Sequence, residues 1–109
     1  TGCADQTEGH DSMSKHAYMV VDARSTDPER MAEYRQLAQL AVEKHGGRYL
    51  VRGAPYETLE GSWQPQRLVM LEFPSMEAAR GFYNSPEYLA AREARAGVSD
   101  FDMLLAEAY

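Results

Sequence analysis

The chain has 109 residues, and its 17 acidic and 11 basic side chains give a formal net charge of −6 at pH 7. This length fits one domain, and the 44% hydrophobic and 26% charged residues are typical of a soluble globular protein. The acidic balance, with no cluster of Lys or Arg, excludes the basic surface that nucleic-acid binders need, and no apolar run approaches the roughly 18 residues of a membrane span. We therefore expect a cytoplasmic protein that binds neither nucleic acid nor membrane.

Residues 1–16 are polar, show no periodic pattern and contain the single cysteine of the chain, Cys3. We interpret them as a disordered tail or an upstream extension, with Met13 as a candidate translation start and the folded domain over residues 17–109.

Two other interpretations of the tail stay open. The first three residues could end a lipoprotein cleavage box, which would attach Cys3 to a membrane. Four side chains could also be assembled into a metal site, namely Cys3, His10, Asp11 and His16. Their spacing matches no zinc pattern, so we expect no metal.

The domain begins with a strand followed by a helix. Residues Ala17–Arg24 are β-branched and aromatic, which indicates a strand. Asp27 is a suitable N-cap and Pro28 suits the first helical position, and the apolar residues that follow repeat at intervals of three and four. We predict a helix that ends at His45, before Gly46-Gly47.

The rest of the chain divides into short elements. We predict strands at Arg48–Arg52, Arg67–Phe73 and Phe101–Ala108, with an extended arm over 56–60 and a loop over 61–66 between the first two. A second helix is capped by Ser75, breaks at 84–86, and restarts with Ser85 as cap to run over 87–96.

The resulting order, β-α-β-β-α-β, predicts an α+β, ferredoxin-like fold. We expect an antiparallel sheet with the helices on one face, the last strand beside the first and Arg48–Arg52 beside Arg67–Phe73. From right-handed crossovers we expect the two central strands, Ala17–Arg24 and Arg67–Phe73, to be parallel neighbours.

Alternation along the strands predicts what each face of the sheet carries. One set suits the helices: Met19, Val21, Ala23, Val69, Leu71 and Phe73. The opposite set is also largely apolar: Tyr18, Val20, Leu68, Met70, Leu104 and Ala106. A face of this kind needs a cover, and the simplest cover is the same face of a second copy, so we predict a homodimer.

Parallel central strands would bring Asp22 and Glu72 to one end of the covered face, where we also expect Asp102, His45 and Arg48. Acids grouped in a half-buried site raise the pKa of at least one of them, which suits general acid–base chemistry. The alternative is that these charges form ion pairs at the rim of the dimer.

Several segments resemble, in order, the family called domain of unknown function 1330. They are His45–Gly53 (HGGRYLVRG), Leu59–Trp63 (LEGSW), Leu71–Ser75 (LEFPS) and Ser85–Tyr88 (SPEY). The resemblance covers about residues 17–108. It implies a dimeric α+β barrel, a superfamily that includes cofactor-free monooxygenases, muconolactone-type isomerases and haem enzymes, so the fold implies no single activity.

Other candidates each have a structural alternative. Arg52 and Arg67 suit a substrate carboxylate, with Glu60 nearby, although a Glu60–Arg67 ion pair could simply close the loop. Trp63 is either a lid over a ligand or a hydrophobic plug across the dimer, and we favour the plug. Tyr34 and Tyr83 lie on apolar helix faces and are expected in the core.

We predict a cofactor-free enzyme that acts on a small organic anion in a cleft associated with the dimer. In this hypothesis Glu72 or Asp22 accepts a proton and His45 acts as an acid, while Arg48, Arg52, Arg67, Glu60 and Trp63 contact the substrate. The alternative is a binding or structural dimer module without catalysis, in which the polar cluster is structural.

Overall fold

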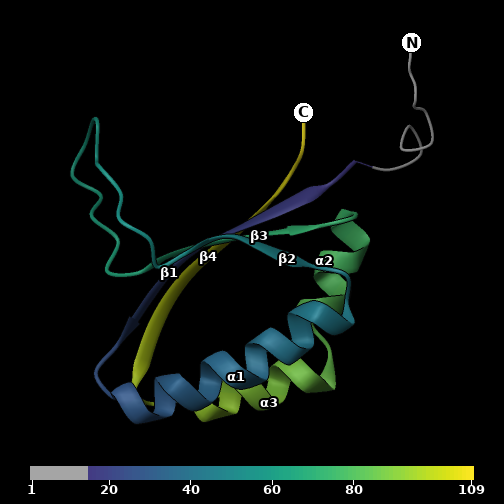
Figure 1. Cartoon of the computed structure of the whole chain (residues 1–109), viewed down its shortest axis with the longest axis horizontal. Helices are drawn as coiled ribbons and strands as arrows, with labels where there is room; N and C mark the ends of the chain where they lie inside the picture. Colours follow the sequence, from purple (N-terminus) through teal and green to yellow (C-terminus); the bar gives the residue numbers. More distant parts are fainter. Residues whose placement is uncertain (1–14) are drawn as a thin grey trace.

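An antiparallel sheet in the order β2-β3-β1-β4 carries the helices on one face (Figure 1). The computed structural model describes residues 15–109, and the rest of the predicted tail lies outside the described residues. The elements are β1 (Ala17–Ser25), α1 (Pro28–Lys44), β2 (Arg48–Arg52), β3 (Leu68–Phe73), α2 (Met76–Tyr83), α3 (Pro86–Ala94) and β4 (Ser99–Glu107). The predicted ferredoxin-like fold and the predicted neighbours of each strand are confirmed.

The prediction that the two central strands are parallel is wrong, because β1 pairs with β3 in antiparallel register. The crossover through α1 makes β2 run in the same direction as β1, with one strand position left open between them. The chain then turns back into the gap between them, so β3 runs against both neighbours. Tyr18 therefore lies opposite Glu72, and Asp22 lies opposite Leu68.

The predicted capping residues lie at the N-termini of the helices and bond to their free backbone N–H groups. The Asp27 carboxylate accepts hydrogen bonds from the backbone N–H groups of Glu29 and Arg30, both at 3.1 Å. Ser85 is buried, and its hydroxyl accepts from the Tyr88 N–H at 3.1 Å and donates to the Phe82 carbonyl at 2.7 Å. This double contact fixes the turn between α2 and α3.

The core lies between the sheet and the helices. Its buried side chains from β1 and β3 are Ala17, Met19, Val21, Ala23, Leu71 and Phe73, as the alternation predicts. Phe73 and Tyr88 both pack against Phe82, with ring centroids 5.0 and 4.5 Å away. These contacts join α2 and α3 to the sheet.

The opposite face of the sheet carries no helix (Figure 1). Leu104 on β4 is 69% exposed on this face. An arm of residues 53–67 projects from the sheet between β2 and β3 (Figure 1). Within the described residues, no helix is long and apolar enough to cross a membrane, and no group of three His, Cys, Asp or Glu side chains is placed to hold a metal ion.

Candidate functional site

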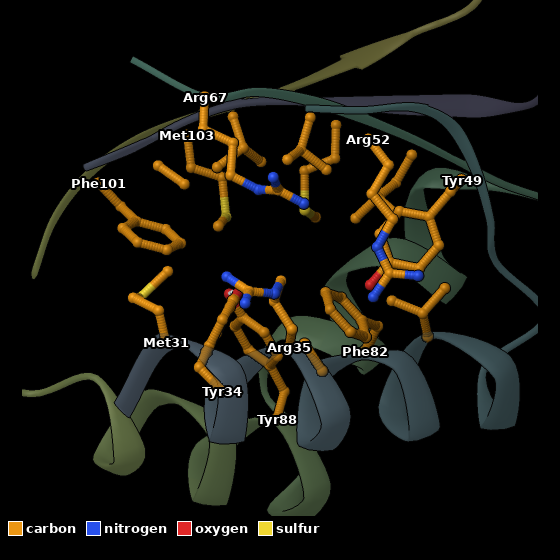
Figure 2. Close-up of a pocket in the computed structure, with 17 residues that line it drawn as sticks. Met31, Tyr34, Arg35, Tyr49, Arg52, Arg67, Phe82, Tyr88, Phe101 and Met103 are labelled. Atoms are coloured by element: carbon orange, nitrogen blue, oxygen red, sulfur yellow. Dashed lines mark hydrogen bonds between the residues drawn. The ribbon is translucent and has the colours of Figure 1, made fainter. Parts of the chain in front are cut away.

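A cavity lies between the helix-bearing face of the sheet and α1 (Figure 2). The free space inside it is about 30 Å³, so a ligand larger than a few water molecules needs the wall to move apart. Its wall is largely apolar and includes Met19, Val21, Met31, Val42, Phe101 and Met103. Thioether side chains are flexible, so three methionines give the wall room to adapt to a bound molecule.

Arg35, Arg52 and Arg67 also line this cavity. Figure 2 shows Arg67 reaching from the sheet and Arg35 reaching from α1 into the same space. Burial, followed by the positive charges of Arg35 and Arg52, lowers the pKa of Arg67. Within residues 15–109, no carboxylate lies at ion-pair distance from any of the three. A protein of net charge −6 therefore places an uncompensated positive cluster at an apolar cavity.

A β-bulge directs Arg52 into the cavity. Strict alternation would place Tyr49 and Arg52 on opposite faces of β2, because they are three residues apart. The register shifts between Tyr49 and Val51, so Arg52 comes to lie opposite Val69, whose side chain also lines the cavity. The Arg52 guanidinium then stacks on the Tyr49 ring at 4.2 Å and donates to the Gln39 side-chain oxygen at 2.9 Å. Bulges are a common way to re-aim a side chain at a site.

Gly53 makes room for Arg67. Its φ of 70° lies in the left-handed region, and its N–H donates to the Leu68 carbonyl at 2.8 Å. A Cβ added at this position would lie 2.3 Å from a terminal nitrogen of Arg67. Glycine is therefore suited to this position both by its backbone conformation and by the packing of the guanidinium against it.

Two phenol groups complete the cavity wall. The hydroxyl oxygens of Tyr34 on α1 and Tyr88 on α3 are 2.8 Å apart, and both side chains line the cavity. The Tyr34 ring makes an edge contact with Phe101 at a centroid distance of 5.3 Å. Burial strongly raises the pKa of Tyr34, so its phenol is neutral and is able to donate a hydrogen bond.

Glu72 lies on the other face of the sheet and is not part of this cavity. Its carboxylate accepts hydrogen bonds from Arg48 Nε at 2.6 Å and His16 Nδ1 at 2.9 Å. Hydrogen bonds from His16, Arg48 and Tyr18 lower the pKa of Glu72 to about 2. The expected rise in the pKa of a clustered acid is therefore wrong for Glu72, because its neighbours are donors. His16, which we placed in the tail, is held here, and its carbonyl also accepts from the Ala108 N–H at 2.8 Å.

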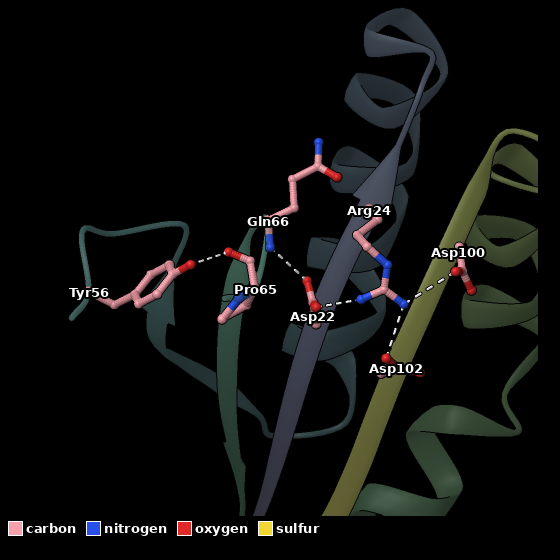
Figure 3. Close-up of polar contacts among 7 residues, drawn as sticks. All are labelled: Asp22, Arg24, Tyr56, Pro65, Gln66, Asp100 and Asp102. Atoms are coloured by element: carbon pink, nitrogen blue, oxygen red, sulfur yellow. Dashed lines mark hydrogen bonds and ion pairs between the residues drawn. The ribbon is translucent and has the colours of Figure 1, made fainter. Parts of the chain in front are cut away.

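Asp22 lies at the opposite end of the same face. It is 4% exposed, pairs with Arg24, and accepts from the Gln66 N–H at 3.0 Å (Figure 3). Arg24 also bonds Asp102 at 3.0 Å, which confirms that Asp102 arrives beside Asp22. The prediction that Asp22 and Glu72 meet is wrong, because it depended on parallel central strands.

His45 forms the C-cap of α1. Its side chain contacts residues of α2 and α3 and neither of the two acids. Its Nε2 is 3.6 Å from Glu87 Oε1, and its ring makes an edge contact with Phe82 at 6.4 Å. Lys44 Nζ also lies 2.6 Å from Glu87 Oε2. These contacts tie the end of α1 to the start of α3, so the expected meeting of His45 with Asp22 and Glu72 does not occur.

Glu60 and Trp63 lie on the arm, and neither lines the cavity beneath the sheet. Trp63 is 54% exposed, and its carbonyl accepts from the Thr58 hydroxyl at 2.7 Å. The Tyr56 hydroxyl donates to the Pro65 carbonyl at 2.6 Å, closing the base of the arm (Figure 3). No Glu60–Arg67 ion pair occurs in the part of the chain that the structure describes.

Of the residues predicted to contact a ligand, the structure brings Arg52 and Arg67 together at the cavity. Sequence reasoning missed Arg35, Tyr49 and Tyr88. Tyr34 packs against the core as predicted, and it also lines the cavity. One signal was available. Positions 31, 35, 38 and 42 share a helix face, so Arg35 is a charged residue inside the buried stripe of α1.

The comparisons with known proteins agree with this fold. Solved structures of similar shape include the RPA0582 protein of unknown function from Rhodopseudomonas palustris, with 20% identity, a TM-score of 0.70, and coverage of 100% of this chain and 98% of that chain. SnoaB, a cofactor-independent oxygenase from Streptomyces nogalater, has 12% identity, a TM-score of 0.61, and coverage of 88% and 95%.

A dimeric ferredoxin-like protein of unknown function from Thermobifida fusca has 15% identity and a TM-score of 0.61, with 87% and 92% of the two chains covered. At these identities the likeness shows the fold. No curated protein matches the chain. The model of one family, Domain of unknown function (DUF1330), matches residues 16–109. The chain therefore belongs to this family, as the order of its motifs indicates.

Proposed function

We propose that the protein binds a small, partly apolar organic anion in the cavity between the sheet and α1. The observation that carries the proposal is the group of Arg35, Arg52 and Arg67, which face the cavity without a carboxylate partner among the described residues. Arg35 and Arg67 are half-buried and Arg52 is exposed. Like charges held close together repel one another, so a site of this kind favours an anion that neutralises them. The guanidinium group suits a carboxylate because it can donate two parallel hydrogen bonds.

The cavity also suits a cofactor-free enzyme. Arginines and neutral phenols stabilise an oxygen that gains negative charge during a reaction, such as that of an enolate or phenolate. A fold neighbour, SnoaB, is itself a cofactor-independent oxygenase, which supports an enzymatic role for this scaffold. Glu72, Asp22 and His45 do not line the cavity, so their predicted acid–base roles are not part of this proposal.

The second candidate is a binding module without catalysis, on the same cavity. The two are separated by incubating the protein with small carboxylates that it binds and analysing the mixture by mass spectrometry. An enzyme depletes one of these compounds catalytically, whereas a binding module returns all of them unchanged.

We further propose a homodimer in which the two open sheet faces cover each other. This assembly is supported by the apolar side chains on that face, by the 69% exposure of Leu104 in the single protomer, and by fold neighbours described as dimeric. In this arrangement the clusters around Asp22 and Glu72 lie at the two ends of the shared face. Trp63, on the arm, remains predicted as a plug against the partner, and the cytoplasmic location also stays a prediction.

Anion binding is tested by isothermal titration calorimetry with a panel of small aromatic and branched aliphatic carboxylates. Arg67→Gln removes one cavity charge, and Arg80→Gln is the matched control because Arg80 is exposed on α2 and changes the net charge equally. We expect Arg67→Gln to weaken binding by about tenfold or more, since a charge-assisted hydrogen bond contributes about 1.5–3 kcal/mol. We expect Arg80→Gln to leave binding unchanged. Failure of every carboxylate to bind the wild type at millimolar concentration would overturn the proposal, as would equal losses in the two variants.

A further inference from the structure

The tyrosine pair in the cavity holds more hydrogen-bonding capacity than its own contact uses. Tyr34 and Tyr88 bond to each other at 2.8 Å, and neither hydroxyl makes another hydrogen bond within residues 15–109. Each phenol carries one proton, so the mutual bond uses one O–H and leaves the other without an acceptor. A buried donor that has lost its water is costly unless a partner is supplied.

The surroundings do not supply that partner. Tyr88 is 1% exposed, and its ring is enclosed by Phe82 and Tyr83 at centroid distances of 4.5 and 5.7 Å. Phe101 lies against the Tyr34 ring at 5.3 Å. These neighbours are aromatic rings, which fix the orientation of the two phenols and give their hydroxyls no strong acceptor. The space next to the pair is the cavity that both side chains line.

The arginines cannot take the spare proton, because a guanidinium has donors and no acceptor. The cavity therefore presents two kinds of donor to a bound molecule. Cationic N–H groups come from Arg35, Arg52 and Arg67, and one neutral O–H comes from the tyrosine pair. A ligand with two oxygen-bearing groups, one anionic and one neutral, is complementary to both kinds of donor.

We propose that the tyrosine pair donates a hydrogen bond to a carbonyl oxygen of the bound anion, so that the ligand class is the small oxo acids. The carboxylate of such an acid would lie against the arginines, and its ketone oxygen would accept the spare Tyr O–H. This inference rests on the proposed function, because it needs the anion to occupy the cavity. It adds a specificity contact on the helix side of the cavity, made by α1 and α3.

The experiment compares matched acids that differ by one carbonyl group. The probes are 4-acetylbenzoate against 4-ethylbenzoate, and 4-methyl-2-oxopentanoate against 4-methylpentanoate, all titrated calorimetrically. In the wild type we expect the oxo acid of at least one pair to bind about threefold to tenfold more tightly, the range of one neutral hydrogen bond.

The variant is the double substitution Tyr34→Phe with Tyr88→Phe. Replacing both partners of a hydrogen bond by isosteric apolar groups is close to neutral for stability, so the fold is expected to persist. In this variant we expect the preference for the oxo acid to fall to about onefold, with the binding of the deoxy acids retained. Tyr83→Phe is the control, because Tyr83 packs against Tyr88 without lining the cavity, and it should keep the preference.

The outcomes separate the two proposals. If the wild type binds none of the four acids, both the proposed function and this inference are wrong. If it binds them without preferring either oxo acid, or if the preference persists in the double variant, the tyrosine contact is wrong while anion binding stands.

Discussion

Asp22 and Glu72 lie on the same face of the sheet at opposite ends of the β1–β3 ladder, where Asp22 is paired with Leu68 and Glu72 with Tyr18. Each carboxylate therefore has its own set of donors. Glu72 is held by His16 and Arg48 near the chain termini, and Asp22 is held by Arg24 and the backbone of Gln66. The two acids act in different parts of the molecule.

Glu72 should stabilise the fold in a pH-dependent way. Its pKa is about 2 in the folded protein, below the ordinary value of 4.5, so its contribution is complete above pH 4.5 and is lost as the pH falls towards 2. We expect Glu72→Gln to lower the free energy of unfolding by about 1–2 kcal/mol at pH 7, after allowance for the exposed side chains of both donors. The difference from wild type should shrink on acidification. Urea unfolding followed by circular dichroism at several pH values measures it.

Glu57→Gln is the control for this titration, because Glu57 is exposed on the arm. It should show little change at any pH. A deficit in Glu72→Gln that is as large near pH 2 as at pH 7 would contradict the assigned role of the carboxylate charge.

The proposed dimer depends on the open sheet face. Leu104→Glu places a charge at the 69% exposed position on β4, and a charge buried without a partner is costly, so we expect the dimer to dissociate. Leu40→Glu is the matched control, since Leu40 on α1 is 63% exposed on the helical layer. Sedimentation velocity at micromolar concentration measures the outcome. A wild type that sediments as a folded protomer, or a Leu40→Glu variant that dissociates as Leu104→Glu does, would argue against this face as the interface.

Two glycine substitutions should change stability in opposite directions. A Cβ at Gly47 would lie 2.5 Å from a ring carbon of buried Phe73, so Gly47→Ala forces the core to shift and should cost about 1–3 kcal/mol. A Cβ at Gly81, in α2, meets no atom within 4 Å, so Gly81→Ala should add about 0.5–1 kcal/mol through helix propensity. Thermal unfolding measures both. A stable Gly47→Ala variant would show that Phe73 can move aside.

Much of the fold follows from local signals. The caps at Asp27, Ser75 and Ser85 start the helices where the sequence predicts, because a side-chain oxygen that satisfies free N–H groups is a local interaction. The two faces of β1 and β3 also follow from period-two alternation, which needs no knowledge of neighbouring strands.

The candidate site was harder to predict from the sequence than the fold, because it depends on how separate elements pack together. Arg48 and Arg52 are four residues apart on β2 and would share a face in a regular strand. The bulge between Tyr49 and Val51 separates them, so Arg48 meets Glu72 on the open face while Arg52 enters the cavity. The residue types in β2 do not indicate that the strand contains a β-bulge.

The sequence by itself determined the order of elements, their caps, the apolar character of both sheet faces and the family. The tertiary structure decided the direction of β3, and with it the separation of Asp22 from Glu72 and the meeting of Arg35, Arg52 and Arg67. The physical reason is the distance along the chain over which each interaction acts. Caps and alternation act within a few residues of chain, whereas strand direction, register and cavity walls arise from packing between segments far apart in sequence.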